Sequence, residues 1–217
     1  MKKILYAGAE VMPFAATGGL GDVLGSLPAA VKRKNPDCDV RVVMPLYGQI
    51  KAEWRDKMTF VKYLMVPLAW RSLYCGIFSI EKDGVTFYFL DNEYYFKRNA
   101  LYGSYDDAER FAFFSVAILE MMRVLNFYPD VLHANDWQTA LTVIKLKRAY
   151  AERPDYKNIK AVYTIHNIEY QGKYSLDILG DLFGISENDR YLLEYEGCIN
   201  LMKGAIECCE MFSTVSP

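Results

Sequence analysis

The chain has 217 residues, of which 52% are hydrophobic and 24% charged, with 25 basic and 27 acidic side chains and a formal net charge of -2. This length accommodates one large or two small domains, and the composition excludes both a disordered polyelectrolyte and a general electrostatic surface for nucleic acid. The aromatic content of 15% is more typical of core packing than of stacking platforms for sugars or bases.

The cysteines and the N-terminus bear on location. Five cysteines, an odd number without C-x-x-C spacing, fit neither a disulfide framework nor a zinc site, and they are typical of reduced thiols. The basic start resembles a signal peptide, but Glu10 and Pro13 interrupt the apolar run. No stretch reaches the roughly 18 apolar residues of a membrane-spanning helix. We therefore expect a cytoplasmic protein without membrane or nucleic-acid partners.

Short apolar runs alternate with stretches of helical period, an order that predicts an α/β fold with a mostly parallel sheet. Within this pattern, Pro28 is expected to kink or split the first helix, and Asp106 and Glu109 have the spacing of a capping box. The expected strands are 3–9, 40–44, 130–133, 160–165 and 211–215, the last stopping at Ser216-Pro217, and the expected helices are 20–34, 105–125, 138–150 and 188–209.

Between residues 60 and 91 the apolar period changes to two. The segments 75–80 and 85–90 flank Lys82-Asp83-Gly84, which is a hairpin signature. The sequence therefore predicts an antiparallel insertion in the sheet or an antiparallel addition at its edge.

Ligands of open α/β sheets bind beyond the carboxyl ends of the parallel strands. The first predicted strand leads into Ala16-Thr17-Gly18-Gly19-Leu20-Gly21-Asp22. The glycines let the backbone approach a ligand closely, and the N-terminus of the following helix would suit an anion. The segment is neither a Walker A loop nor a dinucleotide fingerprint, and a tight turn without a ligand explains it equally well. No Lys or Arg stands beside it, so a diphosphate bound there would need cations from elsewhere, which points to a second domain.

The only two histidines, His133 and His166, are both expected where strands end, and Asp136 follows three residues after His133. One such histidine is usually structural, but two at the same sheet edge favour a binding site. Without i,i+4 spacing or cysteine support, a metal site is disfavoured, and hydrogen bonding to a polyhydroxylated substrate suits these residues better. The absence of a G-x-S-x-G motif disfavours a hydrolase.

Five segments resemble, in order and spacing, the N-terminal half of the bacterial glycogen synthase and plant starch synthase family. They are ILYAGAEVMPFAATGGLGDVLGSLPAA (4–30), LYGSYDDAERFAFFS (101–115), DVLHANDWQTAL (130–141), YTIHNIEYQG (163–172) and STVSP (213–217). The resemblance implies a Rossmann-like, doubly wound, mostly parallel sheet with an antiparallel hairpin insertion, the N-terminal half of a GT-B glycosyltransferase. Residues 1–217 would form one catalytic domain, and the C-terminal nucleotide-binding domain would be absent from this chain.

The activity that the resemblance implies is the retaining transfer of glucose from ADP-glucose to the non-reducing end of an α-1,4-glucan, with no metal or other cofactor. The chain alone is expected to be inactive, because half of the cleft is missing. Two alternatives stay open: a glucan-binding module without catalysis, and another GT-B glycosyltransferase with a different donor or acceptor.

The resemblance also implies roles for individual residues. Thr17, Gly18 and Gly19 would approach the donor phosphates, and Asp22 would begin the helix beside the cleft. Tyr102, Asp136 and His166 match positions that line the glucosyl and catalytic region, with Asn167 next to them, and His166 and Asp136 are the expected catalytic residues. The chain departs from the family where Ala16 replaces the usual lysine and where Asn135 and Gln138 replace common histidines. The choice between ADP- and UDP-glucose therefore stays open.

Overall fold

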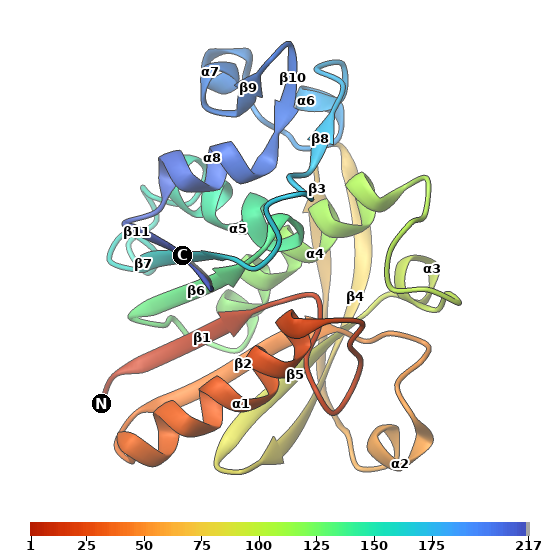
Figure 1. Ribbon diagram of the computed structural model, residues 1–217, viewed down its shortest axis with the longest axis vertical. Coiled ribbons are helices and arrows are strands. Elements are labelled where there is room, and N and C mark those ends of the chain that lie inside the picture. Colours follow the sequence, from red (N-terminus) through yellow and green to blue (C-terminus); the bar gives the residue numbers. More distant parts are fainter. Residues whose placement is uncertain (216–217) are drawn as a thin grey trace.

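The structure, a computed structural model, describes residues 1–215 and is built on an eight-stranded sheet with helices on both faces (Figure 1). In the order β11-β7-β6-β1-β2-β5, all neighbouring strands are parallel, and β4 and β3 extend this sheet as antiparallel strands. The strands are β1 (Lys3–Ala7), β2 (Asp39–Pro45), β3 (Thr59–Leu68), β4 (Arg71–Lys82), β5 (Val85–Asp91), β6 (Val131–Asn135), β7 (Lys160–Ile165) and β11 (Met211–Thr214). The predicted α/β class is confirmed.

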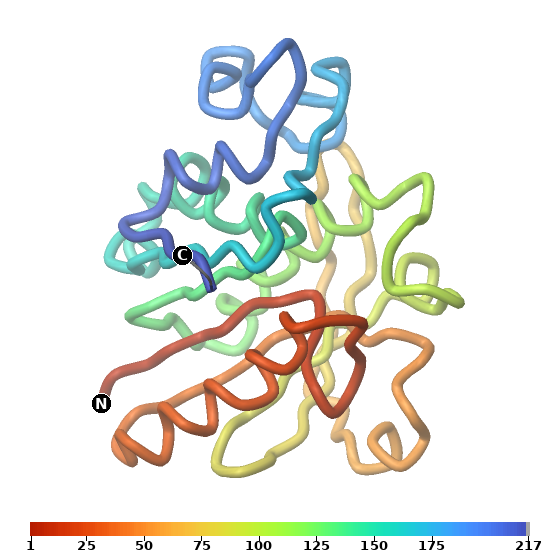
Figure 2. The backbone as a smooth tube through the Cα atoms, viewed as in Figure 1, coloured from red at the N-terminus to blue at the C-terminus, as the bar shows by residue number. Residues whose placement is uncertain are grey.

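The helices form two layers. Helix α1 connects β1 to β2, and helix α5 connects β6 to β7. These two connections run in opposite directions along the sheet, so right-handed crossovers place α1 and α5 on opposite faces of it (Figure 2). Helix α5 also packs against α4 and α8. The helices are α1 (Gly19–Lys34), α2 (Ala52–Arg55), α3 (Glu93–Phe96), α4 (Asp107–Val124), α5 (Trp137–Arg148), α6 (Ile178–Asp181), α7 (Arg190–Leu193) and α8 (Leu201–Cys208), with a 3-10 turn η1 (Glu187–Asp189).

The parallel part of the sheet has the strand order of a doubly wound Rossmann fold. Counted in chain order, β5-β2-β1-β6-β7-β11 reads 3-2-1-4-5-6. The direction of winding reverses between β1 and β6, and in such sheets this point opens a crevice beyond the carboxyl ends of the strands. The core strands are buried on both faces, which explains their continuous apolar runs.

The hairpin signature is confirmed, because β4 and β5 pair antiparallel from Lys82 and Val85 onward. Asp83 and Gly84 both have positive φ, 53° and 75°, as the tight hairpin turn requires. Strand β5 has a second role that the sequence pattern did not reveal, since its other edge pairs with β2 as part of the parallel sheet.

The helix expected over 188–209 is wrong. Its middle contains two strands, β9 (Glu194–Tyr195) and β10 (Cys198–Asn200), which form a second, three-stranded sheet of order β8-β10-β9 with β8 (Lys173–Tyr174). Glu196 and Gly197, with φ of 52° and 77°, turn the chain between β9 and β10. Asn200 then caps α8 by accepting a 3.0 Å hydrogen bond from the amide of Lys203. The turn and the cap break the helical period.

Two further local expectations are not met, namely the split of the first helix at Pro28, which was one of two alternatives there, and the capping box. Helix α1 continues through Pro28 without splitting, because Pro28 and Leu24 are buried and their packing offsets one lost backbone hydrogen bond. The capping box is not formed, since the carboxylate of Asp106 binds the guanidinium of Arg98 at 2.6 and 2.7 Å. The other predicted elements are present, with their ends moved by a few residues. Ser216-Pro217, the predicted end of the last strand, lies outside the described residues.

Candidate active site

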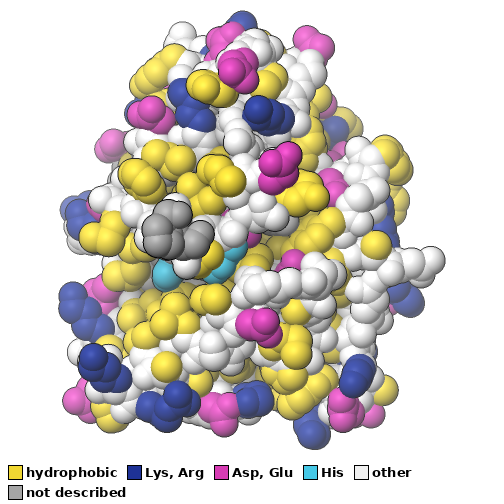
Figure 3. Space-filling model, viewed as in Figure 1, with side chains coloured by type: hydrophobic (Ala, Val, Ile, Leu, Met, Phe, Trp, Pro, Cys, Tyr) yellow, Lys and Arg dark blue, Asp and Glu magenta, His cyan; other side chains and the backbone are white. Residues whose placement is uncertain are grey.

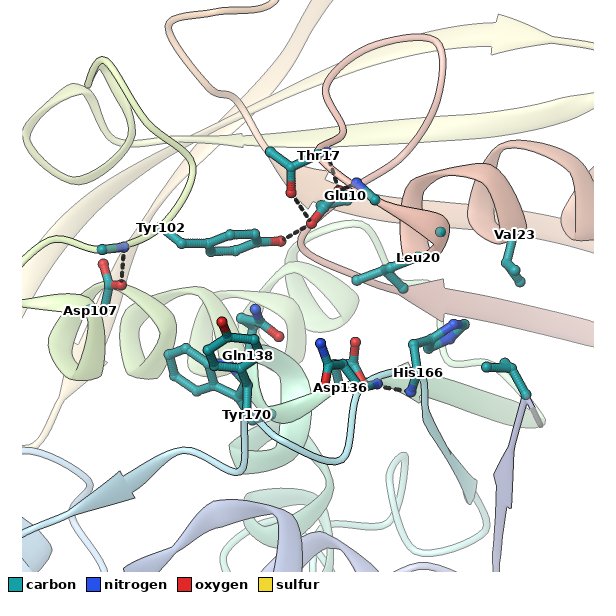
Figure 4. A pocket seen from close by; sticks show the side chains of 16 residues that line it. Glu10, Thr17, Leu20, Val23, Tyr102, Asp107, Asp136, Gln138, His166 and Tyr170 are labelled. Carbon is teal, nitrogen blue, oxygen red and sulfur yellow. Dashed lines mark hydrogen bonds between the residues drawn. The ribbon is translucent and has the colours of Figure 1, made fainter. Parts of the chain in front are cut away.

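A cavity of about 790 Å³ opens at the carboxyl edge of the sheet, beside the point where the winding reverses (Figure 4). Its volume lies within the usual range for small-molecule sites. It is lined by Glu10, Thr17, Gly18, Gly19, Leu20, Val23, Tyr102, Gly103, Asp107, Asp136, Trp137, Gln138, His166, Asn167, Tyr170 and Val215. The structure thus brings together seven of the eight residues expected from the sequence. Asp22 is the exception, because it is exposed in the first turn of α1 and does not line the cavity.

The loop before α1 is held by a buried carboxylate. Glu10, only 5% exposed, accepts hydrogen bonds from the backbone amides of Thr17 and Gly18, the latter at 3.1 Å. It also accepts one from the Thr17 hydroxyl at 2.9 Å and one from the Tyr102 hydroxyl at 2.8 Å (Figure 4). Two amides that the sequence suggested for phosphate binding are therefore already engaged by a carboxylate.

The glycines of this loop divide into two groups. A Cβ added at Gly18 or Gly19 would meet nothing within 4 Å, so both positions face open space. A Cβ at Gly21 would lie 2.2 Å from the Cβ of Ala16, and one at Gly25 would lie 2.7 Å from a backbone oxygen. Gly18 and Gly19 thus leave room for a ligand, whereas Gly21 and Gly25 permit close packing of α1 on the preceding loop.

Asp136 connects the ends of β6 and β7. Its Oδ1 accepts the backbone amides of His166 at 2.7 Å and Asn167 at 3.3 Å, which leaves Oδ2 without a hydrogen bond from the described chain (Figure 4). Its backbone has φ 58° and ψ 176°, a costly conformation for a residue with a side chain, and such strain concentrates at functional sites. Burial raises the pKa of Asp136, although the two amide bonds and the charge of His166 act in the opposite direction.

The ring of His166 lines the cavity, and its Nε2 lies 2.9 Å from Oδ1 of Asn135. Burial lowers the pKa of His166, and the nearby charge of Asp136 opposes this shift. The ring is therefore biased toward its neutral form, in which one nitrogen donates a hydrogen bond and the other accepts one.

His133 does not belong to the cavity, and its expected position at a strand end is wrong. Strand β6 runs on to Asn135, so His133 is an interior strand residue. Its ring packs on Tyr6 at 5.0 Å between centroids, and its Nε2 lies 2.7 Å from the hydroxyl of Thr164. Burial, followed by the charge of His166, lowers its pKa to about 4. This histidine therefore has the ordinary structural role of a half-buried, neutral ring.

The charged side chains that line the cavity are all acidic. They are Glu10, Asp107 and Asp136, and among the described lining residues there is no Lys or Arg. On the face shown in Figure 3, histidine lies in the central hollow, and most Lys and Arg side chains lie toward the periphery. The cavity thus suits a neutral, hydroxyl-rich group or a developing positive charge, and it would repel a diphosphate that had no other cations nearby.

Several lining residues were not predicted as site residues from the sequence. Glu10 entered it only as an interruption of the apolar start, although a carboxylate that follows an apolar strand directly was an available signal. Gln138 is 7% exposed, and its Oε1 has no hydrogen-bond partner among the described residues. An unpaired buried acceptor beside a cavity is suited to a hydroxyl group of a ligand. Trp137 and Tyr170 add aromatic surface to the same wall.

Within residues 1–215, no group of three or more His, Cys, Asp and Glu side chains is placed to hold a metal ion. Within the same range, no helix combines the length and the apolar character needed to cross a membrane.

The arrangement is similar to that of a solved glycosyltransferase structure. The catalytic domain of starch synthase IV from Arabidopsis thaliana, bound to ADP and acarbose, superimposes with a TM-score of 0.88 at 29% sequence identity. The likeness covers 100% of this chain and 45% of that one. The strand order, the cavity at the reversal point and this likeness place the chain in the GT-B class of glycosyltransferases.

Sequence comparison identifies the family. The model of the starch synthase catalytic domain matches residues 3–217, and the chain belongs to this family. Glycogen synthase from Clostridium perfringens (strain 13 / Type A) is 48% identical over 216 residues, and that from Clostridium novyi (strain NT) is 50% identical over 219 residues. These alignments cover 99% of this chain but only 44% and 45% of the two relatives. The chain thus spans less than half the length of the curated relatives that it matches.

Proposed function

We propose that the protein containing this chain is a glycogen synthase, which transfers glucose from ADP-glucose to the non-reducing end of an α-1,4-glucan with retention of configuration. Residues 1–217 form one catalytic domain in this proposal, and a second domain supplies the nucleotide contacts. The observation that carries it is the acidic cavity at the sheet's reversal point in a chain of this family. The Arabidopsis thaliana neighbour bound to ADP and acarbose supports a nucleotide donor and a glucan acceptor.

The charge of the cavity supports its assignment to the sugar rather than the diphosphate. In the reaction, the anomeric carbon exchanges its bond to a phosphate oxygen for one to the acceptor 4-hydroxyl oxygen, and the hydroxyl proton is released. Positive charge develops on the sugar, and the carboxylates of Glu10 and Asp136 would stabilise it, whereas the carboxylate of Asp107 is already paired with the guanidinium of Arg110. The negative charge on the leaving diphosphate requires cations, which the second domain would provide.

The proposed substrate contacts follow from the free hydrogen-bond acceptors of the lining residues and from the space that they leave. The Asp136 carboxylate and the His166 ring hold the glucosyl unit as the catalytic residues, since both line the cavity and each retains an unpaired acceptor. Asn167 follows on the same wall, and Tyr102 closes the opposite side through its bond to Glu10. Thr17, Gly18 and Gly19 give the donor phosphates room to approach. Fixed groups of this kind accelerate a reaction by orienting the reactants and stabilising charge.

The test is glucosyl transfer to a maltooligosaccharide, measured with labelled ADP-glucose. We expect no transfer by residues 1–217 alone and transfer by a longer protein that continues into the second domain. His166→Ala and Asp136→Ala should each abolish the activity of the longer protein. Transfer by the isolated chain would contradict the proposed division of the cleft. Tight maltooligosaccharide binding without transfer by the longer protein would instead favour a binding module.

The donor nucleotide is tested separately. Ala16 stands where the family usually has lysine, so the comparison of ADP-glucose with UDP-glucose should include Ala16→Lys in the longer protein. We propose ADP-glucose as the preferred donor, and a higher kcat/KM for UDP-glucose would contradict this choice. We also propose a cytoplasmic location, which five free cysteines support.

A further inference from the structure

The amide of Asn135 is oriented by its surroundings. Asn135 is 1% exposed, and its Nδ2 lies 3.1 Å from the carbonyl oxygen of Ala7 and 3.1 Å from that of His133. Carbonyl oxygens only accept hydrogen bonds, so the group between them must be the NH₂ with its two hydrogens. The Oδ1 of Asn135 then has to be the atom that faces His166.

This orientation determines where the neutral His166 ring carries its proton. Oδ1 of Asn135 only accepts, and Nε2 of His166 lies 2.9 Å from it, so Nε2 must donate. In a neutral imidazole the other nitrogen, Nδ1, then keeps its lone pair. Nδ1 has no hydrogen-bond partner among the described residues, and the ring lines the cavity.

We propose that Asn135 is a positioning residue that fixes neutral His166 as the Nε2–H tautomer, so that Nδ1 accepts a hydrogen bond from a hydroxyl group of the bound sugar. Asn135 does not itself line the cavity. It acts through His166, whose ring it connects to β1 and β6 by the two bonds of its own NH₂ group. Without this amide, either nitrogen of His166 could carry the proton, and a part of the molecules would present an N–H where the sugar needs an acceptor.

The proposal rests on the proposed function only for the identity of the ligand. The tautomer is a property of the chain without substrate, so its measurement can fail while glucosyl transfer is intact. Conversely, a longer protein without transferase activity would leave the tautomer unchanged. The two hypotheses are therefore distinguishable.

The experiment is a long-range ¹H–¹⁵N NMR spectrum of the chain at neutral pH, which distinguishes a protonated ring nitrogen from one with a lone pair. The chain has only two histidines, so a His133→Gln variant assigns both sets of signals. We expect His166 with a protonated Nε2 and an unprotonated Nδ1. In Asn135→Ala, the His166 signals should shift toward a mixture of the two tautomers. Asn158→Ala is the control, because exposed Asn158 precedes β7 at the end opposite to His166, and it should leave the signals unchanged.

Two NMR results would overturn the proposed tautomer or the role of Asn135 in fixing it. One is a wild-type spectrum with the proton on Nδ1, and this measurement needs no variant, so a failure of Asn135→Ala to fold does not affect it. The other is an Asn135→Ala spectrum in which the His166 tautomer is unchanged. In the longer protein, Asn135→Ala should lower kcat/KM for transfer about fivefold to tenfold, the size expected for one hydrogen bond. Unchanged kcat/KM would contradict the role of Nδ1 as a sugar contact.

Discussion

Tyr102 donates its phenolic hydrogen to Oε1 of Glu10 at 2.8 Å, and this bond joins two segments that are 92 residues apart in the sequence. The same carboxylate accepts two backbone amides and a hydroxyl from the loop before α1. A single buried side chain therefore sets the relative position of two cavity walls. The geometry of the Gly-rich loop depends on Glu10 at least as much as on its glycines.

Replacing Glu10 should separate the effect of its hydrogen bonds from that of its charge. In Glu10→Gln, the amide oxygen can accept from the amides of Thr17 and Gly18, while the NH₂ donates to the hydroxyls of Thr17 and Tyr102, since hydroxyls also accept. We expect this variant to keep the loop and Glu10→Leu to release it. Hydrogen exchange at the amides of Thr17 and Gly18 measures this directly, with slow exchange in the first variant and fast exchange in the second.

Glu10→Leu should also lower the free energy of unfolding by about 1–3 kcal/mol, because buried donors lose their acceptor. Equal protection of both amides in Glu10→Leu and wild type would show that another group holds the loop. Loss of protection in Glu10→Gln would contradict the exchange of donor and acceptor roles described above.

Asp136→Asn should affect catalysis far more than stability. An asparagine Oδ1 can still accept the amides of His166 and Asn167, so urea unfolding should change by no more than about 1 kcal/mol. The lost negative charge should reduce transfer by the longer protein by roughly 100-fold or more, if the carboxylate stabilises charge on the sugar. Asp37→Asn, the same change at an exposed position, should alter neither quantity. A large loss of stability in Asp136→Asn would reduce Asp136 to a structural role.

The parts of the fold that the sequence predicted are those with a strong local pattern. The apolar, β-branched run of β7 and the turn at Asp83-Gly84 are encoded by neighbouring residues, and the structure confirms both. The helix expected over 188–209 failed because apolar residues recur at helical spacing through a segment that turns at Glu196-Gly197. Pairing with β8, from a distant part of the sequence, decides the structure there, and periodicity carries no information about it.

The candidate site was predictable where residues follow parallel strands, because the sheet topology brings such positions together. This accounts for Asp136 and His166. The contribution of Glu10 required knowledge of which amides it meets, and the exclusion of His133 depended on β6 extending two residues beyond the expected end. Side-chain partners across strands are determined by tertiary packing, so no spacing rule within one segment reveals them.

An alanine at Gly21 should destabilise the chain, and an alanine at Gly19 serves as the control. Gly21→Ala would put a Cβ 2.2 Å from that of Ala16, and neither group is flexible, so we expect a loss of about 1–3 kcal/mol in the free energy of unfolding. Gly19→Ala meets nothing within 4 Å and should change stability by no more than about 0.5 kcal/mol. Urea denaturation of both variants tests this. Equal stability of the two would mean that the loop moves away from α1 without cost.

The half-buried ring of His133 should make the chain less stable in acid. Its pKa of about 4 in the folded chain lies below the ordinary value of 6.5, so folding favours the neutral ring. The resulting stabilisation is fully present above pH 6.5 and is lost as the pH falls toward 4, because the unfolded chain then binds a proton that the folded chain resists. Between neutral pH and about pH 4.5 the loss amounts to roughly 2 kcal/mol.

Carboxylates also titrate in this pH range. The contribution of His133 is therefore obtained by comparing the pH dependence of stability in wild type with that in a variant without this histidine. Urea unfolding of wild type and of His133→Gln, each at neutral pH and at about pH 4.5, cancels the groups that the two proteins share. Glutamine retains a side chain able to hydrogen-bond but has no proton to gain, so its loss of stability in acid should be smaller by roughly 2 kcal/mol. Identical pH dependence of stability in the two proteins would mean that His133 has the same pKa in the folded and unfolded chain. The surroundings of the ring in the folded chain would then not disfavour its charged form.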